Sequence, residues 1–341
     1  MRGLAVGDAL GSQFFVPGNF PLLRRRALPP GPWQWTDDTE MAVSVVAVLV
    51  AHGRVDQDAL AASFAEHHDF DRGYGPAVNR MLRLIRQEGG DWRELAAGLF
   101  EGQGSWGNGA AMRVAPLGAW FADDPERAAE EAERSAEVTH QHAEAIAGAR
   151  AVAAAAALVA RAEPPDGVRH ARQAGPGGLE SPERLKGPMG AAGSTTGTPV
   201  SSRASQGEEL LVRVQHLVPR GAVHAGLRRA VDMLDYADVG TVAAVLGCGR
   251  RTSAQDTVPF ALWAVARYIG DFREAVWRAI GAGGDVDTTC AIIGGILAAG
   301  GPGSPGSPRR AAAAPPADWD AGTEPLPAWL TESLERRRPE T

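Results

Sequence analysis

The stretch Trp35-Thr36-Asp37-Asp38-Thr39-Glu40 and its counterpart Gly283-Gly284-Asp285-Val286-Asp287-Thr288-Thr289 decide how this chain is organised. Each brings two carboxylates and neighbouring threonine hydroxyls to the point where a polar, turn-rich segment gives way to an apolar run. The runs are Met41 to Val50 and Cys290 to Ala299. At this length, such runs favour buried helices over strands. The sequence therefore predicts two helices whose first turns carry acidic and hydroxyl side chains.

These acidic motifs have two interpretations at the level of sequence. Capping accounts for one Asp or Thr at each helix start, because free backbone N–H groups and the helix dipole favour negative charge there. It does not readily account for Asp-Asp in one motif and Asp-x-Asp-Thr in the other, since neighbouring carboxylates repel unless they are solvated or neutralised. Carboxylate and hydroxyl oxygens without His or Cys suit Mg²⁺, Mn²⁺ or Ca²⁺ rather than zinc. We expect one shared metal site, provided that the two motifs meet in the fold.

Length, composition and charge restrict the class of protein. A chain of 341 residues with 44% hydrophobic residues is globular and forms one large domain or two ordinary ones. The net charge of -7 argues against a general nucleic-acid or anionic-membrane surface, although a local anion site stays possible. We therefore expect no direct nucleic-acid binding and no membrane association, and we expect a monomer.

The two cysteines, Cys248 and Cys290, are too few for a disulfide framework and suit a reducing compartment. The segment Met1 to Asp8 reaches a carboxylate before any long apolar region forms, so it does not resemble a signal peptide. No run reaches the roughly 20 apolar residues that a membrane span needs. The expected location is the cytoplasm.

A second informative region extends from Glu101 to Arg113. Glycines at positions 102, 104, 107 and 109 let the backbone approach a ligand closely and point several N–H groups inward, which is a common way to hold phosphate. The region lacks the Lys-Ser/Thr ending of a nucleoside-triphosphate loop. By composition alone, an anion-binding loop and a flexible turn are equally compatible with it.

No segment shows sustained alternation of apolar and polar residues, so we predict an all-α protein. The two acidic motifs frame a single compact domain over residues 1–341. Within it, residues 163–207 are rich in Pro, Gly, Ser and Thr and predict a flexible insertion, while residues 301–324 predict a Pro/Ala/Gly-rich loop.

The motifs together resemble one family. The chain is similar to the ADP-ribosylglycohydrolases, which include the dinitrogenase reductase-activating glycohydrolases and the ADP-ribosyl-acceptor hydrolases. The matching blocks follow the family order and span most of the chain apart from the insertion and the tail. They are Gly7-Asp8-Ala9-Leu10-Gly11, Thr36-Asp37-Asp38-Thr39, Gly73-Tyr74-Gly75, Gly104 to Arg113, Thr139-His140 and Gly283 to Thr288.

The resemblance implies an all-helical fold with a binuclear magnesium centre, in which Mn²⁺ could replace Mg²⁺. Carried over by position, the implied metal ligands are Thr36, Asp37, Asp38, Asp285, Asp287 and Thr288. The implied ligand-binding residues are Gly75, Gly104, Ser105, Trp106, Gly107, Asn108, Gly109 and His140, with the glycine-rich loop cradling the diphosphate of ADP-ribose. Trp106 stands where family members often have another side chain, and we expect it to contact the ligand.

The implied activity is metal-dependent removal of ADP-ribose from a modified protein side chain. A metal-bound water would attack the anomeric carbon of the distal ribose, with Asp37, Asp38 and Asp287 as the catalytic carboxylates. Some serine-linkage hydrolases of this family carry Glu where Phe15 stands here, so we favour an arginine N-glycosidic linkage. The Gly-Tyr-Gly and glycine-loop blocks nevertheless look closer to the serine-type branch.

Two alternatives therefore stay open. One is an O-linked ADP-ribose hydrolase acting on ADP-ribosyl-serine or O-acetyl-ADP-ribose. The other is a non-catalytic ADP-ribose-binding protein, against which the intact acidic residues argue.

Overall fold

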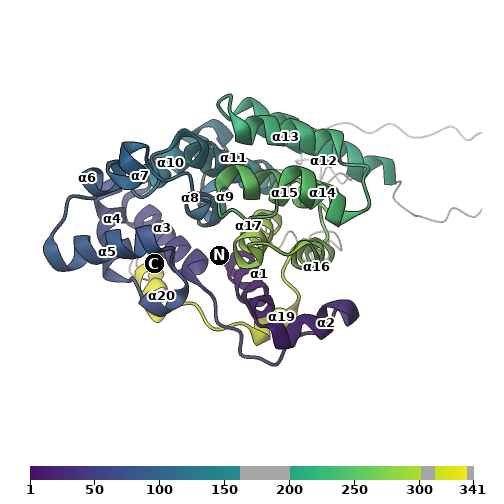
Figure 1. Ribbon diagram of the computed structural model, residues 1–341, viewed down its shortest axis with the longest axis horizontal. Helices are drawn as coiled ribbons and strands as arrows, with labels where there is room; N and C mark the ends of the chain where they lie inside the picture. The colour runs from purple at the N-terminus through teal and green to yellow at the C-terminus, as the bar shows by residue number, and fades with distance from the viewer. Residues whose placement is uncertain (162–199, 301–311, 336–341) are drawn as a thin grey trace, which may run out of the picture.

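A stripe of glycines on the first helix sets the centre of the fold. Helix α1 (Arg2–Ser12) places Gly3, Gly7 and Gly11 against helix α17 (Val286–Ala299), and the two helices lie side by side near the middle of the molecule (Figure 1). A Cβ atom on Gly7 would collide with the backbone carbonyl of Cys290, so only glycine permits this approach. The packing brings the beginning of the chain beside a segment almost 290 residues later.

The computed structural model describes residues 1–161, 200–300 and 312–335. The described residues form α-helices and short 3₁₀ turns with no β-strand, only two isolated bridges, and this confirms the predicted all-α class. The other helices before the insertion are α2 (Phe20–Arg25), α3 (Asp37–His52), α4 (Gln57–Glu66), α5 (Pro76–Glu88), α6 (Trp92–Ala97), α7 (Leu99–Gly102), α8 (Gly109–Met112), α9 (Ala115–Trp120), α10 (Pro125–Glu137) and α11 (Ala143–Arg161). After it come α12 (Val200–His216), α13 (Ala222–Asp232), α14 (Val239–Leu246), α15 (Ala254–Arg267), α16 (Phe272–Ala282), α19 (Ala317–Gly322) and α20 (Ala328–Glu335).

Helix α11 is the central helix of the core. Its alanines between Ala145 and Ala157 are buried among α8, α9, α10, α15 and α17, because small side chains let several helices approach one axis. By length and composition α11 could cross a membrane, and it is the one such helix among the described residues. Since 67% of its most apolar window is buried inside the protein, its apolar surface is accounted for by the core.

The acidic motifs stand at helix starts, as the sequence predicts. Helix α3 begins at Asp37 with Thr36 as its N-cap residue, and helix α17 begins at Val286 with Asp285 as its N-cap residue. Most residues of both helices beyond their first turns are buried. The buried helices thereby fix the positions of the polar side chains at their ends.

The predicted insertion is too long at its carboxyl end. Residues 200–207 belong to helix α12, whereas 163–199 lie outside the described residues. Gly207 looks like a helix breaker in the sequence but is buried against the backbone of Ala266, so it allows close packing of α12 on α15. A glycine needed for helix contact cannot be told from a loop glycine by composition.

The predicted loop at 301–324 also contains a helix. Residues 301–311 lie outside the described part, but α19 spans Ala317–Gly322. Its Trp319 is fully buried and lies edge-on to Phe272 and Trp277. One large aromatic side chain thus anchors a segment whose overall composition is typical of a loop.

Candidate metal centre and ligand pocket

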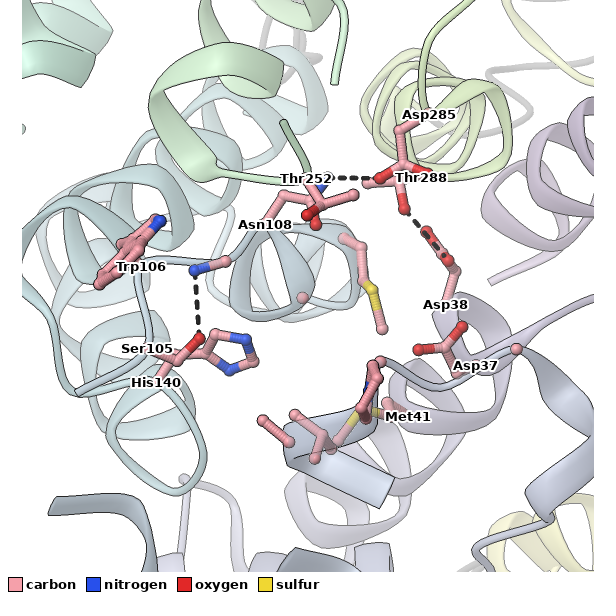
Figure 2. A pocket seen from close by; sticks show the side chains of 18 of the residues that line it. Asp37, Asp38, Met41, Ser105, Trp106, Asn108, His140, Thr252, Asp285 and Thr288 are labelled. Carbon is pink, nitrogen blue, oxygen red and sulfur yellow. Dashed lines mark hydrogen bonds between the residues drawn. The ribbon is translucent and has the colours of Figure 1, made fainter. Parts of the chain in front are cut away.

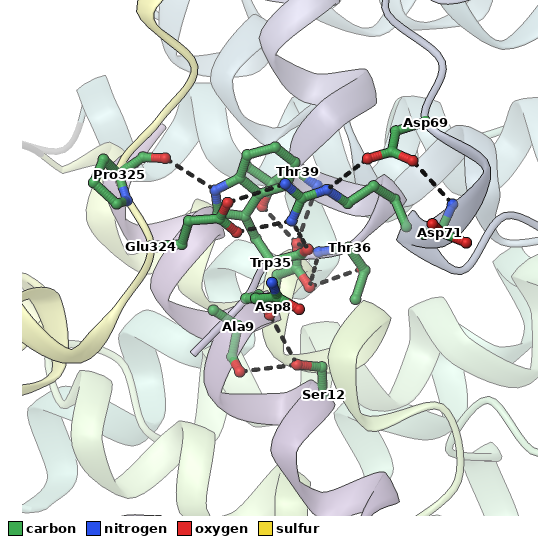
Figure 3. A network of polar contacts seen from close by, with 12 residues as sticks. Asp8, Ala9, Ser12, Trp35, Thr36, Thr39, Asp69, Asp71, Glu324 and Pro325 are labelled. Carbon is green, nitrogen blue, oxygen red and sulfur yellow. Dashed lines mark hydrogen bonds and ion pairs between the residues drawn. The ribbon is translucent and has the colours of Figure 1, made fainter. Parts of the chain in front are cut away.

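The carboxylate of Asp8 caps helix α3 from the neighbouring helix α1 (Figure 3). The hydroxyl of Thr36 does not cap its own helix. Instead, Asp8 accepts hydrogen bonds from the backbone N–H groups of Thr36 at 3.0 Å and Thr39 at 3.1 Å. It also accepts from their hydroxyls, at 2.8 Å and 2.5 Å respectively. Asp8 therefore fixes the first turn of α3 relative to α1.

Asp8 is not among the site residues predicted from the sequence. The residue is fully buried, and its oxygens face four donors from one helix start. In the sequence, Asp8 is a single carboxylate in an otherwise small and apolar stretch, within the family block Gly7-Asp8-Ala9-Leu10-Gly11. That pattern does not reveal which helix the carboxylate contacts.

The two acidic motifs meet, which answers the question that the sequence left open. One oxygen from each of Asp8, Asp38 and Asp287 lies within 4.8 Å of the other two. The hydroxyl of Thr288 donates to Asp38 Oδ2 at 3.4 Å, and the hydroxyl of Thr36 donates to the same oxygen at 3.1 Å. Asp38 Oδ1 is buried and has no hydrogen-bond partner. A buried carboxylate oxygen without a donor is suited to binding a cation.

The electrostatics of the cluster support this inference. Burial, followed by the charge of Asp8, raises the pKa of Asp37 from 3.8 to about 8. Burial and the neighbouring carboxylates raise the pKa values of Asp38 and Asp287 well above the usual range. In the described ranges, none of the ion pairs between basic and acidic side chains includes a residue of this cluster. A divalent cation would neutralise these groups, and the all-oxygen donor set fits Mg²⁺ or Mn²⁺.

Asn108 connects the second acidic motif to the glycine-rich loop. Its side-chain amide donates to Asp285 at 2.7 Å and to the hydroxyl of Thr257 at 2.9 Å. Asn108 is also the N-cap residue of the short helix α8. The amide therefore holds Asp285 at a fixed place relative to the loop that precedes α8.

A cavity of about 610 Å³ opens between the two acidic motifs and the glycine-rich loop (Figure 2). In the figure, Asp37 and Asp38 face Ser105, Trp106 and His140 across the cavity. Most of the predicted site residues line it, namely Asp37, Asp38, Asp285, Asp287, Thr288, Gly75, Ser105, Trp106, Gly107, Asn108, Gly109 and His140. Two predicted residues do not line it, Thr36 and Gly104. Thr36 lies behind the carboxylates and bonds Asp8 and Asp38.

Gly104 has a packing role in the structure. Its φ of +73° favours glycine, and a Cβ atom there would lie 2.9 Å from the backbone nitrogen of His142. The next residue, Ser105, does line the cavity. Its hydroxyl accepts a hydrogen bond from the N–H of Gly107 at 3.2 Å. The expected ligand-binding loop is thus 105–109, and Gly104 lets it start close to residues 141–142.

His140 forms the base of this loop. The side chain is buried, and a Cβ atom on Gly107 or Gly109 would lie within 3.1 Å of its ring. Its Nδ1 is 2.6 Å from the hydroxyl of Thr139. Burial, followed by the charge of Arg113, lowers the pKa of His140 to about 3. His140 is therefore a neutral polar group in the wall, suited to hydrogen bonding rather than to proton transfer near neutral pH.

The segment that contains Arg251 and Thr252 completes the cavity. The backbone N–H of Asn108 donates to the carbonyl of Thr252 at 3.0 Å, and the N–H of Ala254 donates to the carbonyl of Trp106 at 3.0 Å. Thr252 lines the cavity together with Arg251 and has a φ of +49°, a strained value for a β-branched residue. These residues follow no motif, so only their spatial position identifies them.

Phe100 is a further lining residue that the sequence did not indicate. Its ring centroid is 4.8 Å from that of Trp106, and its side chain is 45% exposed. Trp106 lies across the cavity from Asp37 and Asp38 (Figure 2), and the ring of Phe100 beside it completes an aromatic wall. Such a wall can stack on the flat face of a base.

The profile of the ADP-ribosylglycohydrolase family matches residues 1–304. The chain belongs to this family. ADP-ribosylhydrolase ARH3 of Homo sapiens is 27% identical over 88% of this chain and 83% of its own length. The chicken (Gallus gallus) ADP-ribosylhydrolase ARH3 is 34% identical over 41% of this chain and 43% of its own length. The ADP-ribosyl-[dinitrogen reductase] glycohydrolase of Rhodospirillum rubrum is 31% identical over 41% of this chain and 49% of its own length.

The chain thus aligns with less than half of the chicken and bacterial relatives and with most of the human one. A solved structure described as an ADP-ribosylglycohydrolase-related protein complex superposes with a TM-score of 0.60 at 25% identity. That alignment covers 98% of this chain and 92% of the other. These findings confirm the predicted family, the predicted all-helical ADP-ribosylglycohydrolase fold and the predicted enzyme class.

Proposed function

We propose that this ADP-ribosylglycohydrolase removes ADP-ribose from arginine side chains of a modified protein in a reaction that needs two Mg²⁺ ions, or Mn²⁺ in their place. The observation that supports this most is the single cavity that joins the glycine-rich loop to the carboxylate cluster. A ligand with phosphate groups at its centre and a ribose at one end would place its phosphates at the glycine-rich loop and that ribose at the carboxylates.

The residues that would hold the ions are Asp37, Asp38, Asp285, Asp287, Thr288 and, from behind, Thr36. The unpartnered Oδ1 of Asp38 and the raised pKa values of the cluster support this assignment. When bound, the ions would supply positive charge that orients ribose hydroxyls and favours ionisation of the attacking water. Asp37, Asp38 and Asp287 would act at the anomeric carbon of the distal ribose by holding that water and accepting its proton.

The rest of ADP-ribose would be held by the opposite walls. The backbone of 105–109 would face the diphosphate, with the neutral His140 beneath it. The aromatic wall of Phe100 and Trp106 would stack on the adenine. The exposed guanidinium of Arg251, at the rim of the cavity, would attract the negatively charged ligand.

The preference for arginine rests on Phe15. This residue follows α1, has a side chain that is 49% exposed, and does not line the cavity, so no carboxylate reaches the site from that position. The O-linked alternative keeps one supporting observation, since Gly73 and Gly75 of the serine-type block both line the cavity.

The test is a parallel assay on peptides that carry ADP-ribosyl-arginine or ADP-ribosyl-serine, with Mg²⁺ and with a chelator, in which released ADP-ribose is quantified by mass spectrometry. Metal-dependent release from the arginine peptide supports the proposal, and release from the serine peptide alone would establish the O-linked alternative. Asp287→Asn should abolish release. Asp91→Asn, an exposed N-cap residue of α6, is the matched control and should keep it. Tight ADP-ribose binding with no turnover of either peptide would support the binding-only alternative.

A further inference from the structure

Helix α5 presents a row of three arginines that the proposed chemistry does not use. Arg80, Arg83 and Arg86 are three residues apart, which places them along one side of the helix. All three are exposed, and in the described part of the chain none has a carboxylate within 4.0 Å. Within the described ranges, their one side-chain hydrogen bond is from Arg86 to the carbonyl of His68 at 3.5 Å. Because like charges at this spacing repel, the row does not stabilise its own helix.

The arginine row borders a cavity of about 740 Å³, which we call the arginine groove. Its walls include Arg80, Arg83 and Arg86 together with Phe70, and among the described residues no Asp or Glu lines it. Phe70 is 73% exposed, the largest value among the exposed large apolar side chains. A concave surface with three cations and an exposed aromatic ring is typical of a binding surface.

The arginine groove adjoins the carboxylate end of the ligand pocket. Pro76 lines both cavities, and Gly73 and Gly75 line the ligand pocket while Tyr74, between them, lines the groove. A Cβ atom on Gly73 would lie 3.7 Å from Asp37 Oδ1, so this shared wall is next to the proposed reaction centre. The aromatic wall that would hold adenine borders the pocket elsewhere, at Phe100 and Trp106.

This arrangement determines which part of a substrate would reach the groove. In the proposed function the acceptor side chain is joined to the distal ribose, which would lie at the carboxylates. The acceptor chain would therefore leave the pocket over residues 73–76, and its neighbouring residues would enter the arginine groove. The charge of the groove then favours acidic neighbours.

We propose that the arginine groove docks an acidic segment of the ADP-ribosylated acceptor protein, an inference that rests on the proposed function. Aspartates and glutamates beside the modified residue pair with Arg80, Arg83 and Arg86, and an apolar neighbour packs on Phe70. A short row of three arginines in a chain of net charge -7 suits a few carboxylates better than a long polyphosphate backbone.

The experiment compares three substrates that share the linkage found to be hydrolysed. These are the free ADP-ribosylated amino acid, a peptide with Asp and Glu on both sides of the modified residue, and a peptide with Ser and Gly there. Arg80→Gln with Arg83→Gln should raise KM for the acidic peptide about three- to tenfold, since each exposed pair contributes modestly. It should leave kcat for the acidic peptide unchanged, and it should leave KM and kcat for the other two substrates unchanged. The difference in KM between the variant and the native enzyme should vanish at about 0.5 M salt.

The matched control is Arg24→Gln with Arg25→Gln on α2. These two arginines are also exposed and are neighbours in the sequence, but α2 lies at the opposite side of the molecule from α5 (Figure 1). The control should leave KM for the acidic peptide unchanged. A rise equal to that of the α5 variant would show a general charge effect and overturn the inference.

The outcomes separate the inference from the proposed function. If the free amino acid is hydrolysed but the acidic and neutral peptides have equal KM values, the docking inference fails and the function stands. If no substrate is hydrolysed, the proposed function fails, and docking is measured by fluorescence anisotropy with the unmodified acidic peptide. Binding that is lost in the α5 variant supports docking, and binding no tighter than that of the neutral peptide overturns it. Tighter, arginine-dependent binding of a single-stranded RNA oligonucleotide would show that the occupant is wrongly assigned.

Discussion

Replacement of Asp8 tests whether this carboxylate positions the metal site or ligates a metal. In Asp8→Ala, the buried N–H and hydroxyl of Thr39 lose their acceptor. An unsatisfied buried donor costs about 1–3 kcal/mol, so the two together should lower the free energy of unfolding by about 2–6 kcal/mol. Because α3 then loses the cap that fixes Asp37 and Asp38, we expect turnover to be lost as well.

Asp8→Asn should behave differently. Its amide oxygen can take the place of Oδ2, which accepts from the backbone N–H of Thr36 and from both donors of Thr39. Its amide nitrogen then faces the hydroxyl of Thr36, which can accept while it donates to Asp38 at 3.1 Å. We therefore expect a cost below about 1 kcal/mol and hydrolysis within roughly tenfold of the native enzyme, about 1.4 kcal/mol in the barrier.

The assays are thermal unfolding and ADP-ribose release with saturating Mg²⁺, and Mg²⁺ affinity by calorimetry. If Asp8→Asn keeps its melting temperature but binds no Mg²⁺ and has no turnover, Asp8 is a metal ligand and the positioning argument is wrong. If Asp8→Ala unfolds at the same temperature as the native protein, the hydrogen bonds to Asp8 do not stabilise the fold as predicted.

Three further predictions follow from the site. First, the folded pKa of Asp37 lies above its unfolded value, so its contribution to stability is complete at low pH and is lost as pH rises toward about 8. The melting temperature of the chelated protein should fall as pH rises from the unfolded value of 3.8 to about 8 and recover with Mg²⁺, and a flat profile without metal would contradict the raised pKa. Second, Trp106→Ala should raise KM roughly tenfold with little change in kcat, since stacking a base is worth about 1–3 kcal/mol, and an unchanged KM in the release assay would exclude stacking. Third, Gly249→Ala should weaken Mg²⁺ binding in calorimetry, because its Cβ would collide with Asp285. Gly53→Ala, which also has a positive φ but nothing within 4 Å, is the control and should bind Mg²⁺ normally.

The helical class and the polar helix starts could be predicted from the sequence because they depend on local patterns. The apolar runs after Glu40 and Thr289 are long enough to indicate buried helices, and both helices exist as α3 and α17. The glycine-rich segment was also recognisable as a break between helices, because closely spaced glycines disfavour regular structure. Whether it was a flexible turn or a cavity wall depended on the segment at Thr252, which it contacts in the fold.

The errors have a common physical cause. Gly207 and Trp319 lie in segments whose composition is typical of loops, yet each makes a buried contact that fixes a helix. Such contacts depend on a single residue and its partner, whereas composition averages over many residues. The same limit applies to Gly104, which belongs to the family motif but packs on residues 141–142 instead of lining the cavity.

By itself, the sequence determined the donor chemistry of this protein, namely carboxylates and hydroxyls at two helix starts and a glycine-rich loop between them. Tertiary structure alone decided that the two starts meet, because the glycine face of α1 brings it against α17 and places Asp8 between the motifs. It also decided which residues outside any motif complete the cavity, such as Phe100 and Thr252. Residue types fix what a site can bind, but distances between segments far apart in the chain are set only by helix packing.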